Sequence, residues 1–274
     1  MNYPDIDPII FALGPLSFHW YGLTYLVGLT LCWWLARMRQ EKSVWSLAHI
    51  DDMLFYLALG VILGGRIGYI FFYNFNSWID NPIILFQIWN GGMSFHGGLI
   101  GVLIAAFIFA RKEGKTFFEL TDFIAPFVPV ALFCGRIGNF INGELWGKAS
   151  TLPWAMRLPC DDQRFYAQFC QVGQPWSIPH HPSMLYEALL EGVILFILLF
   201  WFSAKPRPRM AVSGLFLIGY GSFRFLVEFV RLPDIGIGYL YQNWLTQGQI
   251  LSLPMIIFGS IMFFMAYKNT SKIA

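Results

Sequence analysis

Seven long apolar stretches constrain the fold of this chain more than any other feature. A bilayer core roughly 30 Å thick is crossed by a helix of about 20 mostly apolar residues. The stretches that fit this length cover residues 16–36, 49–73, 94–110, 119–142, 183–203, 212–230 and 249–267. The sequence therefore predicts an all-α, polytopic membrane protein with seven transmembrane helices.

The overall composition agrees with this class of protein. Of the 274 residues, 57% are hydrophobic and only 12% are charged, a balance well outside that of a soluble domain. The net charge of +2 is too small to indicate a nucleic-acid partner. No linker or low-complexity tract marks a second domain, so residues 1–274 are expected to form one integral membrane domain.

The basic residues predict the orientation of the chain. They gather in alternate connections and at the C-terminal end, where the positive-inside rule places the cytoplasm. These clusters are Arg37, Arg39 and Lys42, then Arg111, Lys112 and Lys115, then Lys205, Arg207 and Arg209, and finally Lys268 and Lys272. We therefore expect the N-terminus outside and the C-terminus in the cytoplasm.

One long insertion lies between the fourth and fifth predicted spans. Residues 145–182 are expected on the outer side, where they form a small extracytoplasmic cap. The insertion contains Cys160 and Cys170, whereas Cys32 and Cys134 belong to spans. In an oxidising compartment, Cys160 and Cys170 can form a disulfide; the alternative is a pair of free thiols.

Polar residues within the predicted spans lie in their outer halves. The fourth span carries Arg136 and Asn139 on one helical face, and the sixth carries Tyr220, Arg224 and Glu228 at successive i, i+4 steps. Tyr21, Arg66 and His96 occupy the first, second and third spans. Five helices thus direct polar groups toward one depth, which predicts a shared site.

The three intramembrane arginines require a compensating partner. An arginine within a span costs about 2.5 to 3.5 kcal/mol on insertion scales. Internal ion pairs are one explanation, with Arg224 bound to Glu228, Arg66 to Asp122 or Glu187, and Arg136 to Glu144. A phosphate-bearing ligand is the other, because guanidinium groups bind phosphate through paired hydrogen bonds. Because three arginines lie at one depth, we favour a phosphate-bearing ligand, and a lipid head group is the candidate.

No metal or other cofactor is expected. The histidines lack ligand-like spacing with cysteine or carboxylate residues, and His180 with His181 lies in a proline-flanked loop typical of a turn.

Five sequence blocks carry a family resemblance. They are GGRIGYIFFYN, GGMSFHGGLIG, CGRIGNFINGELWGK, HPSMLYEALLEG and YGSFRFLVEFVRLPD, in this order across the seven spans. The chain resembles the prolipoprotein diacylglyceryl transferase family over nearly its whole length, and the fourth-span block is the most specific. The matching family positions are Tyr21, His96, Arg136, Asn139, Glu144, Gly147, Tyr220, Arg224 and Glu228.

The resemblance implies a reaction and a location. Enzymes of this family transfer the diacylglyceryl group of phosphatidylglycerol to the lipobox cysteine of a prolipoprotein, forming a thioether and releasing glycerol phosphate. This is the first step of bacterial lipoprotein maturation. The implied location is the bacterial cytoplasmic (inner) membrane, with the active site toward the outer side, so the bilayer, phosphatidylglycerol and the prolipoprotein signal region are the expected partners.

The chemistry of this reaction assigns roles to the polar residues. A leaving phosphate monoester gains charge that arginines can stabilise, and we expect Arg136 and Arg224 to act as this clamp. The thiol needs a base, for which His96 is the candidate; the alternative is that His96 only holds a helix start. Arg66, Asn139, Glu144, Gly147, Tyr21, Tyr220 and Glu228 are expected to bind substrate.

A transporter of an anionic solute is the competing class of protein. It would also use intramembrane arginines, but its polar groups would lie near the midplane and continue to the inner side. The inner halves of these spans are nearly all apolar, apart from Asp51, Asp52, Glu119 and Asp122 near their ends. The sequence therefore favours the transferase.

Overall fold

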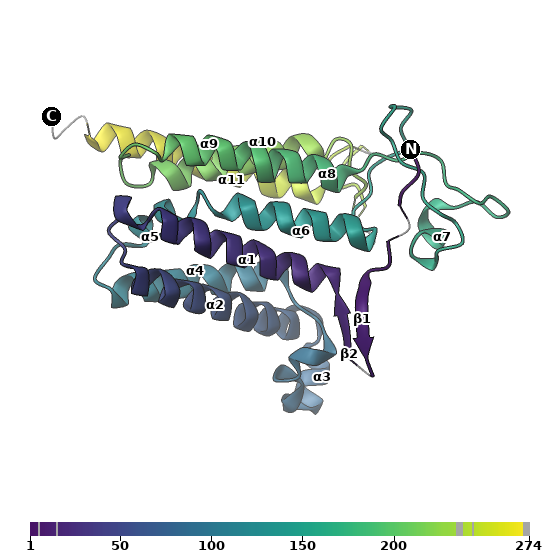
Figure 1. Ribbon diagram of the computed structural model, residues 1–274, viewed down its shortest axis with the longest axis horizontal. Helices are drawn as coiled ribbons and strands as arrows, with labels where there is room; N and C mark the ends of the chain where they lie inside the picture. The colour runs from purple at the N-terminus through teal and green to yellow at the C-terminus, as the bar shows by residue number, and fades with distance from the viewer. Residues whose placement is uncertain (5, 15, 234–237, 243, 271–274) are drawn as a thin grey trace. The chain divides into compact units, whose positions relative to one another are not determined.

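The computed structural model describes residues 1–4, 6–14, 16–233, 238–242 and 244–270. The chain divides into two compact units, with Met1–Cys32 and Ala125–Ala274 in the first and Trp33–Ile124 in the second. Helices dominate both units, as predicted, and the first unit adds a two-stranded sheet (Figure 1).

The second unit is built around two helices that pack through glycines. A Cβ atom on Gly64 would collide with the carbonyl oxygen of Gly97, and one on Gly101 would collide with that of Gly60. Small residues at these contacts let two apolar helices approach closely. The elements of this unit are the end of α1 (Trp20–Met38), η1 (Gln40–Lys42), α2 (Leu47–Tyr73), α3 (Phe75–Asp80), η2 (Pro82–Leu85), η3 (Ile88–Asn90), α4 (Phe95–Lys112) and α5 (Phe117–Ile124).

The first unit begins with a β-hairpin. Strands β1 (Ile9–Leu13) and β2 (Leu16–His19) pair antiparallel, and Gly14 between them has a φ of 58°. Such a positive φ favours glycine. The first apolar stretch, expected to be helical from residue 16, is therefore a strand up to His19 and becomes helical only in α1. That part of the prediction was wrong, because the strand pairing with β1 satisfies the backbone of residues 16–19.

The remaining elements of the first unit carry most of the predicted site. Besides the first part of α1, they are α6 (Val128–Asn142), α7 (Gln163–Phe169), α8 (Ser183–Glu187), the π-helix η4 (Ala188–Ile194), α9 (Leu195–Phe202), α10 (Ala211–Val227) and α11 (Gln247–Thr270). Helix α6 lies close against α1, since a Cβ atom on Gly138 would meet Thr24 Oγ1 at 2.5 Å and one on Gly28 would meet Cys134 Cβ at 3.1 Å.

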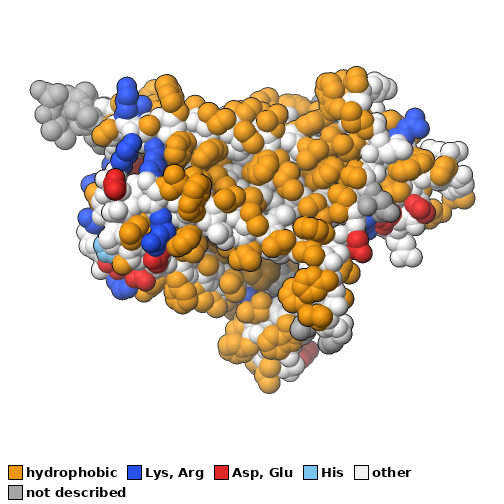
Figure 2. Space-filling view, viewed as in Figure 1, with side chains coloured by type: hydrophobic (Ala, Val, Ile, Leu, Met, Phe, Trp, Pro, Cys, Tyr) orange, Lys and Arg blue, Asp and Glu red, His pale blue; other side chains and the backbone are white. Residues whose placement is uncertain are grey.

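Four helices among the described residues are long and apolar enough to cross a membrane. They are Leu47–Tyr73, Phe95–Lys112, Ser183–Phe202 and Gln247–Lys268, and a fifth is added if the broken pair α5 and α6 counts as one span. Large hydrophobic side chains on them are exposed, including Phe72, Phe95, Trp201 and Phe264, and hydrophobic groups cover much of the face seen in Figure 2. Such surfaces are expected where helices face lipid, so the chain is a membrane protein.

The insertion of residues 145–182 folds around a small core and a ladder of backbone hydrogen bonds. Tyr3 packs there against Trp146, Leu158, Phe165 and Met184, all of them buried. Isolated bridges join Met156 to His180, Pro159 to Trp176 and Asn2 to Arg157. The N-terminal residues thus form part of this insertion, which the sequence alone did not predict.

A disulfide joins Cys160 to Cys170, the first of the two alternatives left open by the sequence. Cys32 and Cys134 are free thiols. Closing a loop with a sequence separation of 10 stabilises a fold by about 3 kcal/mol in the chain-entropy account.

We therefore expect alkylation of the denatured, unreduced protein to label two cysteines, and alkylation after reduction to label four. The replacement Cys160→Ser should make the insertion more susceptible to proteolysis, because the unfolded loop is no longer constrained. The matched control is Cys134→Ser, outside the insertion, which should leave the cleavage rate of the insertion unchanged. Labelling of all four cysteines without reduction would contradict the disulfide.

Candidate active site

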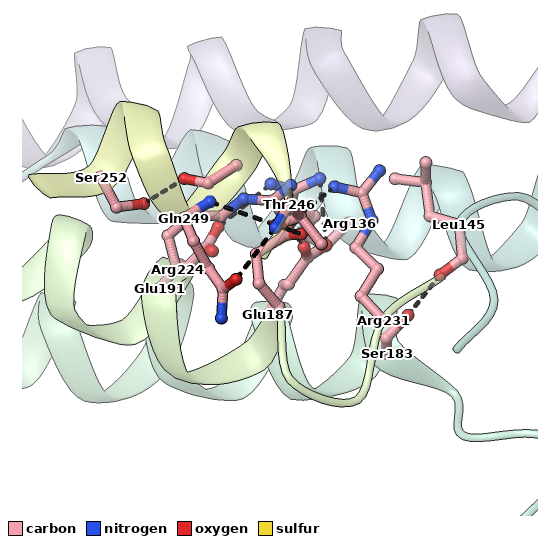
Figure 3. A network of polar contacts seen from close by, with 12 residues as sticks. Arg136, Leu145, Ser183, Glu187, Glu191, Arg224, Arg231, Thr246, Gln249 and Ser252 are labelled. Carbon is pink, nitrogen blue, oxygen red and sulfur yellow. Dashed lines mark hydrogen bonds and ion pairs between the residues drawn. The ribbon is translucent and has the colours of Figure 1, made fainter. Parts of the chain in front are cut away.

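Two arginines of the first unit share one buried carboxylate. Oε2 of Glu187 lies 3.1 Å from Nη1 of Arg136, and Oε1 of Glu187 accepts a hydrogen bond from Nη1 of Arg224. The Glu187 side chain is fully buried, whereas those of Arg136 and Arg224 remain 17% and 14% exposed. Because one rigid carboxylate binds both guanidinium groups, it fixes them side by side (Figure 3).

A second carboxylate extends this ion-pair network along α10. Glu228 binds Arg224 in the i, i+4 pairing expected from the sequence, and its Oε1 lies 3.0 Å from Nη1 of Arg231. Its other oxygen accepts a hydrogen bond of 2.6 Å from Thr246 Oγ1. Both oxygens of Glu228 are therefore engaged by donors.

A third carboxylate approaches Arg136 from the π-helix η4. Oε2 of Glu191 accepts a hydrogen bond of 3.1 Å from Nη2 of Arg136, and the side chain is fully buried. Tyr220 on α10 lies close to Arg136 and Glu191. Single π-helical turns within longer helices are often found at functional sites. We call the six charged residues Arg136, Glu187, Glu191, Arg224, Glu228 and Arg231 the buried cluster.

A group of uncharged donors and one exposed carboxylate adjoins the end of α6. The amide nitrogens of Asn139 and Asn142 donate to Glu144 at 3.2 and 3.1 Å. The Tyr21 hydroxyl hydrogen-bonds to that of Tyr25 at 3.1 Å and lies near Asn139 and Glu144. Gly143 ends the helix in a left-handed conformation with φ 74°. The structure therefore brings the predicted residues Tyr21, Asn139 and Glu144 together.

Gly147 occupies a position with no room for a side chain. It forms an antiparallel bridge with Arg231, and a Cβ atom there would meet His181 Cβ at 2.7 Å and collide with the carbonyl oxygen of Val230. The backbone of Gly147 thus joins the insertion to the segment that carries Arg231.

His180 lies in the same ladder and is the buried histidine of the insertion. Its Nδ1 is 2.9 Å from the carbonyl oxygen of Gly147, which requires the nitrogen to carry the proton. Burial lowers the pKa of His180 below its ordinary value, against the opposing effect of this hydrogen bond. Groups of three or more metal-ligating side chains do not occur among the residues that the structure describes.

The second unit contains the two remaining predicted site residues, Arg66 and His96. All five N–H donors of Arg66 point at backbone carbonyls: Nε donates to Leu85 at 3.2 Å, Nη1 to Gly91 and Gly92, and Nη2 to Ile84 and Gln87. Arg66 therefore anchors the segment that precedes α4. His96 is the second residue of α4 and has an exposed side chain.

Two of the ion pairs considered from the sequence were wrong. Arg66 has carbonyl partners instead of Asp122 or Glu187, and Arg136 pairs with Glu187 and Glu191 instead of Glu144. Glu144 follows the C-terminal end of α6, where it accepts from two asparagines. Sequence reasoning did not assign Glu187 and Glu191 to the site, although two acidic residues four positions apart within an apolar span were a usable signal.

The fold and the site together define a class of protein: a helical membrane protein with a buried cluster of arginines and glutamates on α6, on the α8–η4 segment and around α10. A model of the prolipoprotein diacylglyceryl transferase family matches residues 8–265.

Curated relatives match the chain over nearly its whole length. The phosphatidylglycerol–prolipoprotein diacylglyceryl transferase of Methylococcus capsulatus is 54% identical over 274 residues, covering 99% of each chain. Proteins of the same name from Azotobacter vinelandii and Ectopseudomonas mendocina are 54% and 55% identical, with coverage of 100% and 98% of this chain and 99% and 97% of theirs. The chain belongs to the prolipoprotein diacylglyceryl transferase family.

Proposed function

We propose that this protein transfers the diacylglyceryl group of phosphatidylglycerol to the lipobox cysteine of prolipoproteins. The thiol sulfur forms a bond with the glycerol carbon, the carbon–oxygen bond to phosphate breaks, and glycerol phosphate leaves. The name shared by relatives of more than 50% identity supports this reaction. The structural observation that carries it is the binding of Arg136 and Arg224 to opposite oxygens of Glu187.

Arg136 and Arg224 form the proposed phosphate clamp. Each guanidinium has five N–H donors, and the glutamates occupy only part of them. The partial exposure of both side chains leaves a face that a lipid phosphate can reach. A fixed pair of guanidiniums stabilises the charge that develops on phosphate as the carbon–oxygen bond breaks. Glu228 holds Arg224 in place, and Tyr220 lies close to Arg136.

The other proposed binding residues of the first unit act near this clamp. Tyr21, Asn139 and Glu144 form the polar group at the end of α6, and Gly147 holds the nearby backbone close to Arg231. Because backbone carbonyls already occupy its N–H donors, Arg66 is proposed to position the segment before α4 and not to bind substrate directly. We assign no resident metal or cofactor to the reaction.

His96 is the proposed base for the thiol. The alternative role, holding the start of α4, is filled by Ser94, whose hydroxyl accepts from the backbone N–H of Gly97 at 3.2 Å. No hydrogen bond engages the His96 imidazole among the described residues. Both oxygens of Glu228 are already bound, by two arginines and a threonine, which leaves His96 as the better candidate. An imidazole is also the side chain best suited to accept a proton near neutral pH.

The proposed topology has seven spans, an outer N-terminus and a cytoplasmic C-terminus in the bacterial inner membrane. To the four long apolar helices it adds α1, the broken pair α5 and α6, and α10, a shorter apolar helix. The distribution of lysine and arginine supports this orientation. Residues 145–182 then form an extracytoplasmic cap, and the clamp opens toward the outer side.

Reporter fusions test the orientation. A reporter that works only in the cytoplasm should be active when fused after Ala110 or Ala204. A reporter that works only outside the cytoplasm should be active when inserted within residues 145–182. The inverse pattern would place the clamp on the inner side and contradict the proposed access to translocated prolipoproteins.

Incubation of the purified protein with phosphatidylglycerol and a lipobox peptide tests the reaction itself. The peptide mass should increase by that of one diacylglyceryl group, with release of glycerol phosphate in equal amount. A peptide whose cysteine is replaced by serine is the matched control and should keep its mass. An unchanged cysteine peptide would exclude the transferase activity.

A further inference from the structure

Glu191 is the least compensated carboxylate of the buried cluster. Its Oε2 accepts a single hydrogen bond of 3.1 Å from Arg136, while Oε1 is buried and has no hydrogen-bond donor among the described residues. By contrast, each oxygen of Glu187 has an arginine partner, with Oε2 held by an ion pair of 3.1 Å to Arg136 and no hydrogen bond, and both oxygens of Glu228 are bound. A buried charged oxygen without a donor is costly, so this position favours an added proton.

The charges of the buried cluster balance before substrate enters. Arg136, Arg224 and Arg231 contribute three positive charges, and Glu187, Glu191 and Glu228 contribute three negative charges. The phosphate diester of a lipid donor brings one further negative charge. Because net charge in a region of low dielectric is expensive, the cluster needs one compensating positive charge when the phosphate binds.

The surroundings of Glu191 indicate that this residue binds the compensating proton. Arg136 from α6 is its direct partner, and Tyr220 from α10, Arg231 and Glu228 are close enough to affect its charge. Glu187 lies one turn earlier on the same helical segment and is shared by two arginines. A phosphate in the clamp competes for Arg136 and adds a negative neighbour, and both changes weaken the ionised form of Glu191.

We infer that Glu191 takes up one proton, on Oε1, when the phosphate of the donor lipid binds to the clamp. An O–H bond forms with a proton from the aqueous phase, and no bond of the lipid changes in this step. The inference rests on the proposed function, because it requires the phosphate to bind at Arg136 and Arg224. Glu191 is thus a binding-linked proton acceptor that keeps the occupied site neutral.

Calorimetric titration of phosphatidylglycerol into the purified protein measures this proton directly. In two buffers with different ionisation enthalpies at pH 7.5, wild-type protein should take up close to one proton per lipid bound. The variant Glu191→Gln, which resembles the protonated side chain, should bind lipid at least as tightly and take up close to no protons. As the pH rises, the wild-type dissociation constant for the lipid should increase by up to about tenfold per pH unit, whereas that of the variant should not change.

Matched variants separate this inference from the proposed function. Glu113→Gln, at a carboxylate in the second unit that pairs with His49 and Lys112, should keep the wild-type uptake. Glu191→Asp should also keep it, and provides the comparison if the glutamine variant does not fold. Lipid binding without proton uptake in the wild type, or undiminished uptake in Glu191→Gln, would overturn the inference about Glu191 and leave the proposed clamp intact. Absence of lipid binding in the wild type would overturn the clamp as well.

Discussion

Arg136→Ala is expected to lower the rate of diacylglyceryl transfer about 1,000-fold. Removal of a single preorganised donor to a developing oxyanion lowers the catalytic rate about 100- to 1,000-fold. This substitution removes a whole charged guanidinium group from the phosphate clamp. It also leaves Glu191 without its arginine partner and Glu187 with Arg224 alone. The measurement is the initial rate of peptide lipidation per mole of folded protein at saturating phosphatidylglycerol.

Because loss of one partner from a buried ion pair destabilises a protein by about 3 to 5 kcal/mol, the amount of folded protein must be measured for each variant. Arg224→Lys is the milder comparison, since lysine keeps the charge but loses the two-pronged geometry. It should remain in the membrane while losing much of its rate. Arg157→Ala, at an exposed arginine of the insertion, is the control and should retain wild-type activity. Near-normal turnover in folded Arg136→Ala would exclude Arg136 from the clamp.

His96→Gln has the second largest expected effect, a loss of transfer rate of about 100-fold, which is the usual scale for a lost general base. Glutamine keeps a polar side chain of similar reach but cannot accept the thiol proton. Binding of the donor lipid should be unchanged, because the phosphate contacts belong to the arginines.

The pH profile separates a base from a structural role. A free cysteine thiol has a pKa of about 8.5, so the substrate ionises without help as the pH rises toward that value. The defect of His96→Gln should therefore shrink at higher pH, whereas a defect from misplacement of α4 would persist. A wild-type rate in His96→Gln at neutral pH would show that His96 is not the base and that the positive charge of the arginines is enough to generate the thiolate.

Helical spacing predicted the part of the site that lies on one helix. Arg224 and Glu228 are four residues apart and pair as expected, and in the structure Arg231 extends the same face three residues later. The same reasoning could not find the partners of Arg136. Glu191 is separated from it by 55 residues and lies on a different helix, and such contacts depend on how the helices pack.

The errors in the fold have local causes. Residues 16–19 are apolar enough to continue into α1, but pairing with β1 satisfies their backbone groups in a strand. The fourth apolar stretch is interrupted between α5 and α6, near Pro126 and Pro129. Proline disrupts helix interiors because it lacks an N–H and its ring clashes with the preceding turn, and both prolines were visible in the sequence.

Determining the structure of the protein with phosphatidylglycerol bound tests the central claim most directly. The clamp predicts that phosphate oxygens lie about 2.7 to 2.9 Å from guanidinium nitrogens of both Arg136 and Arg224, the range of charge-assisted hydrogen bonds. A phosphate bound elsewhere, with the two arginines contacting only Glu187, Glu191 and Glu228, would contradict it.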